Sequence, residues 1–103
     1  MVYTSEYEGF GMAPLEGMAC GLPVISTSGG ALAEVSGGGA DLVNYEVEEL
    51  TYRISKVIED SAYRKNLAQR GQDWVKQYTW NNAAFKTYEL YQEILSYKSQ
   101  KYV

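Results

Sequence analysis

The 103-residue sequence predicts an α/β domain with about three parallel strands, flanking helices and a helical C-terminal tail. Two observations support this prediction. Short runs of strand-forming residues alternate with glycine turns and short helical patterns up to about residue 43. From about residue 46 onward, apolar residues recur at helical spacing alone. Strands that alternate with helices are typical of a parallel sheet with right-handed crossovers.

The first strand and the first helix are predicted on either side of a glycine-containing turn. Residues 2–4 are strand formers, and residues 12–20 have a helical pattern. Pro14 suits the first turn of that helix, where its missing N–H costs nothing. Gly21 is a natural stop, and Pro23 follows two residues later.

Two further strands are predicted from short apolar runs. Residues 22–26 are apolar and contain β-branched residues, as in a strand buried on both faces. A loop at residues 27–30 and a helical turn at residues 31–35 follow. After three glycines, residues 40–43 form the third predicted strand.

Three helices are predicted in the remainder of the chain, the last of them fraying after Tyr97, where the sequence becomes polar. Each begins near a side chain that can accept a hydrogen bond from a free backbone N–H. These capping residues are Asn44 for residues 46–59, Asp60 or Ser61 for the helix to about residue 78, and Thr79 for the last helix.

Composition excludes several classes of function. The single cysteine cannot form an intrachain disulfide, and the absence of histidine removes the commonest general base and metal ligand. No apolar run approaches the ~18 residues of a membrane span, and no signal peptide is visible. We therefore expect a cytoplasmic protein.

Charge is distributed unevenly along the chain. Residues 1–50 contain eight acidic residues and no lysine or arginine, whereas residues 51–103 contain all nine basic residues and five acids. The halves therefore carry −8 and +4 (9 − 5). The acidic first half argues against nucleic-acid binding. The basic residues of the second half are interleaved with acids, as on a solvated helix surface.

The most informative stretch is the turn before the first helix. It places seven residues between Glu8 and Glu16, and Gly9 and Gly11 are among them. Glycine lets the backbone turn sharply and approach a ligand closely. A strand, a glycine turn and a helix N-terminus together form a suitable site for a phosphate or another anionic group.

The run over residues 5–35 resembles the donor-binding segment of retaining GT-B glycosyltransferases of family 4, the glycosyl transferases group 1. The shared features are two glutamates around a Gly-Phe-Gly turn, followed by a helix that ends in Gly-Leu-Pro-Val-Ile. The resemblance continues weakly through Tyr78-Thr79-Trp80 and so covers nearly the whole chain.

This resemblance implies that residues 1–103 are one partial domain, half of a Rossmann-like GT-B C-terminal lobe. The upstream half-lobe and the N-terminal acceptor lobe would be missing. In the family the last helix packs across to the other lobe, so we expect its apolar residues to be partly exposed. Any membrane association would occur through the missing lobe. The apolar residues in question are Tyr88, Tyr91, Ile94, Leu95 and Tyr97.

The resemblance also implies the site residues. Glu8 would be the catalytic residue beside the donor sugar, and Gly9 would belong to the donor-binding turn. The N–H groups of Phe10, Gly11 and Met12 would face the sugar and the β-phosphate. Glu16 would hold both ribose hydroxyls, which suits a carboxylate with two accepting oxygens.

The implied reaction transfers a sugar from a nucleotide-diphosphate sugar with retention at the anomeric carbon. It requires neither a D-x-D metal site, which this chain lacks, nor a cofactor. It does require cationic groups against the leaving diphosphate. In the family these come from upstream parts of the lobe, so we expect the isolated chain to be inactive.

Other conspicuous residues have simpler structural explanations. Glu34 is more simply a capping or solvent-facing residue than a ligand contact. Trp74 and Trp80 are expected to pack in the core or against the other lobe. Cys20 is expected to be a small buried side chain, because no basic residue near it in sequence would activate a thiolate.

Two functions remain open. The first is the donor-site fragment of a retaining glycosyltransferase, a hexosyltransferase that works with the missing remainder of the enzyme. The alternative is a stand-alone, non-catalytic α/β module that binds a phosphate-containing ligand or a partner protein. In either case the unpaired first strand favours self-association of the chain.

Overall fold

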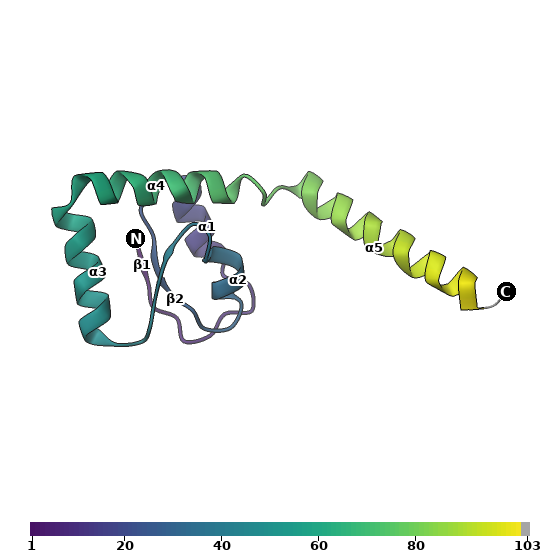
Figure 1. Ribbon diagram of the computed structural model, residues 1–103, viewed down its shortest axis with the longest axis horizontal. Helices are drawn as coiled ribbons and strands as arrows, with labels where there is room; N and C mark the ends of the chain where they lie inside the picture. Colours follow the sequence, from purple (N-terminus) through teal and green to yellow (C-terminus); the bar gives the residue numbers. More distant parts are fainter. Residues whose placement is uncertain (102–103) are drawn as a thin grey trace.

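The computed structural model describes residues 1–101, with side chains through residue 97. These residues form three strands and five helices (Figure 1). In chain order they are β1 (Val2–Tyr3), α1 (Met12–Ala19), β2 (Ile25–Thr27), α2 (Leu32–Ser36), β3 (Asp41–Val43), α3 (Val47–Glu59), α4 (Ser61–Val75) and α5 (Trp80–Lys101).

The three strands form one parallel sheet in the order β1-β2-β3. Val2 pairs with Ile25, and Ile25 pairs with Asp41, so the three strands begin at the same edge. β2 is buried along its whole length, as expected for a central parallel strand. The predicted α/β class and strand number are confirmed.

The core lies between the sheet, α1 and α4. Met18 of α1 and Val24 beside β2 are completely buried. Gly71 lets α4 approach α1 closely, because a Cβ at this position would lie only 2.9 Å from Cγ of Met18. Trp74 of α4 packs against the same cluster, which confirms a packing role for this tryptophan.

The end of α1 explains why β2 begins later than predicted. Gly21 has φ 77°, and its N–H donates to Met18 O at 2.9 Å. The Leu22 N–H donates back to Gly17 O at 3.0 Å, which completes a Schellman motif. The N–H of Leu22 is therefore used at the end of α1, and Pro23 has no N–H that could bond to a neighbouring strand. The predicted strand at residues 22–26 is instead Ile25–Thr27.

Two of the predicted helix caps are confirmed and one is wrong. The Asp60 side chain accepts from Tyr63 N at 2.9 Å, and Thr79 Oγ1 accepts from Asn82 N at 3.1 Å. Asn44 does not cap α3, whose N-cap residue is Glu46 without a side-chain bond. Instead the backbone N–H of Asn44 donates to Oε2 of Glu49 at 3.1 Å. A side chain in the first turn of α3 therefore binds the loop that precedes the helix.

Asp41 at the start of β3 anchors both α3 and α4. It accepts a hydrogen bond from the Tyr63 hydroxyl. It also pairs with Arg70 at 3.2 Å and Arg53 at 3.8 Å. These two guanidinium groups are therefore engaged at the amino end of the strand, away from the edge where parallel sheets bind ligands.

α5 extends away from the other elements, so the molecule measures 64 Å along its longest axis (Figure 1). The five apolar residues expected to be exposed on this helix are exposed. Trp80 is 90% exposed, so its predicted packing role is not realised within the described residues. The helix also continues to Lys101 instead of fraying after Tyr97, and the last two residues lie outside the described part. Through residue 101, no helix combines the length and apolar character that a bilayer crossing requires.

Candidate functional site

The loops after all three strands meet at the carboxyl edge of the sheet. They surround a hollow of about 350 Å³. Its lining comes from the loop after β1, the end of β2 and its loop, and the end of β3 and its loop: Ser5, Glu6, Thr27, Ser28, Gly29, Val43, Asn44 and Tyr45. This confirms the prediction that the first two loops share one edge, where open parallel sheets bind ligands.

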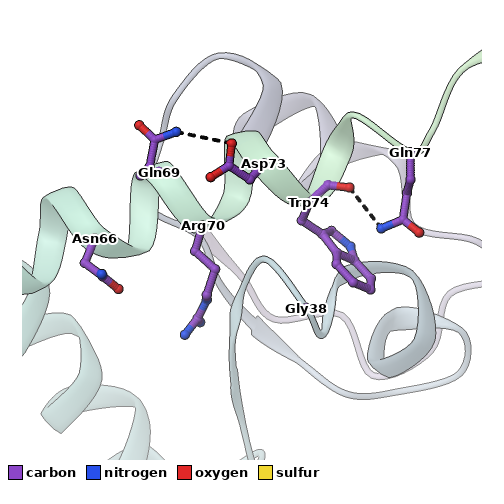
Figure 2. A pocket seen from close by; sticks show the side chains of 7 residues that line it. All are labelled: Gly38, Asn66, Gln69, Arg70, Asp73, Trp74 and Gln77. Carbon is purple, nitrogen blue, oxygen red and sulfur yellow. Dashed lines mark hydrogen bonds between the residues drawn. The ribbon is translucent and has the colours of Figure 1, made fainter.

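A second hollow, of about 540 Å³, lies elsewhere along α4 (Figure 2). Side chains of α4 line it, with Arg70 and Trp74 directed toward its inner side and Gly38 at its floor. Two hydrogen bonds there lie within the helix and its end, Gln69–Asp73 at 3.3 Å and Gln77–Trp74 O at 3.0 Å (Figure 2). Arg70 and Trp74 instead bond to other elements, Arg70 to Ala40 O at 2.8 Å and Trp74 Nε1 to Val35 O at 2.8 Å. None of the predicted site residues lines this hollow or the one at the carboxyl edge of the sheet.

Gly11 forms the N-terminal boundary of α1 in a left-handed conformation. Its φ is 92° and its ψ is 62°, in a region that residues with a Cβ rarely adopt. A Cβ here would also lie 2.6 Å from Cδ2 of Leu32 in α2. No side chain caps this end of α1. The glycine turn therefore presents the N-terminus of an eight-residue helix, as the strand-turn-helix pattern predicted.

The backbone of Glu8 is fixed against the loop that follows β2. Glu8 forms an isolated parallel bridge with Gly30, and its carbonyl accepts from Ala31 N at 2.9 Å. Nearby, Thr27 Oγ1 donates to Ser5 O at 2.5 Å. The loop that carries Glu8 is thus attached at two points to the segment after β2.

The Glu8 side chain bonds to Tyr3 in β1. The Tyr3 hydroxyl donates to Glu8 Oε1 at 2.6 Å, and both residues are partly buried. The hydrogen bond to this carboxylate, together with desolvation, raises the pKa of Tyr3 above its ordinary value. Tyr3 was not among the predicted site residues, because no sequence pattern links a strand residue to a loop carboxylate.

Phe10 points away from the turn into a chain of aromatic rings. Its ring meets Tyr78 edge-on at 6.2 Å between centroids, and Tyr78 lies 6.4 Å from Trp74. Both Trp74 Nε1 and the Tyr78 hydroxyl donate to Val35 O, at 2.8 and 3.1 Å. Burial, with a smaller effect from Glu34, raises the pKa of Tyr78. Two sequence signals pointed to Tyr78, its place in the region of weaker resemblance and its place on the apolar stripe of the predicted helix.

The remaining predicted residues are exposed. Gly9 has open space beside it, and Met12 is 57% exposed at the start of α1. Glu16 lies on the exposed side of α1, and its side chain makes no hydrogen bond or ion pair within residues 1–97. Glu34 is exposed on α2, as its simpler explanation predicted. The structure thus fixes Glu8 and Gly11 tightly and leaves Glu16 available to a ligand.

The prediction for Cys20 is wrong, because this side chain is exposed. Cys20 is the C-cap residue of α1, one position beyond the turns that pack on the core. The described residues also contain no cluster of His, Cys, Asp or Glu that could hold a metal ion. Independence from metals and cofactors stays a prediction.

The chain superposes on sucrose-phosphate synthase from Thermosynechococcus elongatus with a TM-score of 0.73 and 29% identity, over 92% of this chain and 25% of that one. The fold is therefore the α/β fold of GT-B enzymes. Residues 1–74 match the family described as Glycosyl transferases group 1, and the chain belongs to this family.

Curated relatives agree with this assignment. The chain is 34% identical to O-antigen chain mannosyltransferase B of Escherichia coli, over 87% of this chain and 24% of the relative. It is 33% identical to an uncharacterized glycosyltransferase of Methanocaldococcus jannaschii, over 91% of this chain and 28% of the relative. The chain thus spans about a quarter of the length of these relatives.

Proposed function

We propose that residues 1–103 form the donor-site portion of a retaining family-4 glycosyltransferase that uses a nucleotide-diphosphate sugar. The remaining half of the C-terminal lobe and the acceptor lobe would belong to the same enzyme. The observation that carries this proposal is the glycine turn at Gly11, which leads from Glu8 into the N-terminus of α1. Family membership supports sugar transfer as the reaction class.

In this proposal Glu8 and Glu16 act on different parts of the donor. Glu8 lies beside the reacting sugar, where positive charge develops in the transition state. Glu16 binds both hydroxyls of the ribose, and the N–H groups of Phe10, Gly11 and Met12 face the sugar and the β-phosphate. An exposed carboxylate suits binding of a diol, and the Glu16 carboxylate is exposed and has no partner within residues 1–97.

Kinetics of the complete polypeptide that carries this segment test the assignment. Glu16→Ala removes contacts present in both the ground state and the transition state, so the donor KM should rise with little change in kcat. Glu8→Gln keeps the shape but removes the charge beside the reacting sugar, so kcat should fall with little change in donor KM. The opposite pattern would exchange the two roles, and unchanged kinetics in both variants would refute the assignment.

The alternative of a stand-alone module rests on the same glycine turn but does not need a second lobe. The reading frame upstream of Met1 discriminates between the two functions. A continuous frame that encodes a further strand and a loop with Arg or Lys supports the glycosyltransferase. A stop codon and a promoter immediately upstream would support the stand-alone module.

A further inference from the structure

Glu8 is held at both its backbone and its side chain. Its carbonyl accepts from Ala31 N at 2.9 Å, so the main chain is attached to the loop after β2. Its Oε1 accepts from the Tyr3 hydroxyl at 2.6 Å, so the carboxylate is attached to β1. The two attachments come from β1 and from the segment between β2 and α2, and together they restrict the rotation of the side chain.

A carboxylate in this position has a second oxygen to offer. Each oxygen of an ionised carboxylate can accept hydrogen bonds, and a donor on one oxygen does not occupy the other. Within the described residues, Oε2 of Glu8 has no hydrogen-bond partner. We infer that Tyr3 is a positioning residue that holds Oε1 of Glu8 and thereby directs Oε2 toward a hydroxyl of the donor sugar. This inference rests on the proposed function of Glu8.

The chemistry of the Tyr3 hydroxyl suits this role. Proximity to the carboxylate raises the Tyr3 pKa, so the hydroxyl keeps its proton and remains a donor through neutral and mildly alkaline pH. A phenylalanine would serve β1 equally well as a strand residue but could not hold Glu8. Removal of the hydroxyl in Tyr3→Phe therefore distinguishes a positioning role of Tyr3 from a purely structural role in the strand.

The first test uses the complete polypeptide that carries this segment and NMR with labelled tyrosine and glutamate. Glu8→Gln should lower the Tyr3 pKa toward its ordinary value of 10.0, whereas Glu6→Gln, a change at an exposed acid of the same loop, should not. Tyr3→Phe should release the Glu8 side chain, so the NMR scalar couplings that report its rotamer should become averages over several rotamers. Tyr7→Phe, which removes the hydroxyl of a tyrosine that is 77% exposed, should leave these couplings unchanged. A Tyr3 pKa that does not respond to Glu8→Gln, or Glu8 couplings that do not respond to Tyr3→Phe, would overturn the inference.

The second test uses kinetics of the complete polypeptide. Tyr3→Phe should lower kcat about tenfold, the size of effect expected for one hydrogen bond to a charged group, with the donor KM nearly unchanged. Tyr7→Phe should have no effect. Full activity of Tyr3→Phe, or tighter donor binding because Tyr3 had blocked Glu8, would overturn the inference. If Glu8→Gln loses activity while Tyr3→Phe keeps it, the inference about Tyr3 fails but the proposed role of Glu8 stands. If Glu8→Gln is fully active, the proposed role of Glu8 itself is refuted.

Discussion

At the scale of single residues, the two glycines of the turn between β1 and α1 differ in their requirements. Gly11 has a left-handed backbone and faces Leu32, whereas a Cβ at Gly9 would meet no atom within 4 Å. Gly9 also lacks a positive φ. Their shared presence in the motif therefore does not imply a shared structural role. Gly11 shapes the turn, and Gly9 leaves open space beside it.

This difference predicts unequal costs of substitution. Gly11→Ala should reduce the free energy of unfolding by about 1–2 kcal/mol, because alanine is strained in the left-handed region. Gly9→Ala should change it by no more than about 0.5 kcal/mol. Urea denaturation of the two variants measures both values. Equal losses would mean that Gly11 does not keep its left-handed conformation in solution.

Residue-scale contacts were also the least predictable from the sequence. The glycine turn and both glutamates follow from a local motif. The Tyr3–Glu8 bond and the Phe10–Tyr78 contact depend on how loops and helix ends meet in three dimensions. Cys20 was misjudged for a related reason, since apolar neighbours in sequence do not show which way a helix C-cap residue points.

At the scale of elements, the order and type of every helix and strand followed from composition and spacing. The errors lie at the ends of elements. β2 begins three residues late because Leu22 completes the Schellman motif of α1. α4 ends at Val75, three residues before the predicted end, and Tyr78 joins the aromatic contacts instead. In each case tertiary contacts or capping hydrogen bonds, and not the local propensity of the residues, determine where the element begins or ends.

The cap of α4 provides an element-scale prediction. Asp60→Ala removes the bond to Tyr63 N and should cost about 1 kcal/mol, or about 4–8 °C in Tm for a domain of this size. Asp60→Asn should retain most of the stability, because asparagine caps about as well. Ser61→Ala, in the first position of the helix, serves as the matched control. Thermal unfolding followed by circular dichroism measures all three, and an Asp60→Ala variant as stable as the control would contradict the capping role.

At the scale of the whole molecule, β1 is an edge strand with an unpaired side in the described sheet. Exposed edges recruit other chains. We therefore predict that the isolated chain dimerises or aggregates as its concentration rises. Sedimentation velocity over a range of concentrations tests this expectation. A clean monomer at high concentration, with a cooperative thermal transition, would contradict it.

The isolated chain should also bind a donor only weakly. A helix N-terminus favours an anion by roughly 0.3–1 kcal/mol when exposed. The eight acids of residues 1–50 oppose a diphosphate, and Arg53 and Arg70 are engaged by Asp41 at the other end of β3. Association itself costs several kcal/mol, so we expect affinities that are millimolar or weaker. Calorimetric titration with UDP and UDP-sugars measures this, and micromolar binding would reveal a cationic site of different origin.

The aromatic contacts at the start of α5 have a mechanical consequence. α5 has 22 residues and is therefore about 33 Å long, so its two ends move together when the helix rotates as one body. Its pivot lies beside Tyr78, whose ring touches Phe10 in the glycine turn and whose hydroxyl bonds to Val35. A small rotation at the pivot sweeps the far end of the helix through a large arc. We therefore expect a partner that fixes the far end of α5 to restrict Tyr78 and, through the ring contact, Phe10 in the turn.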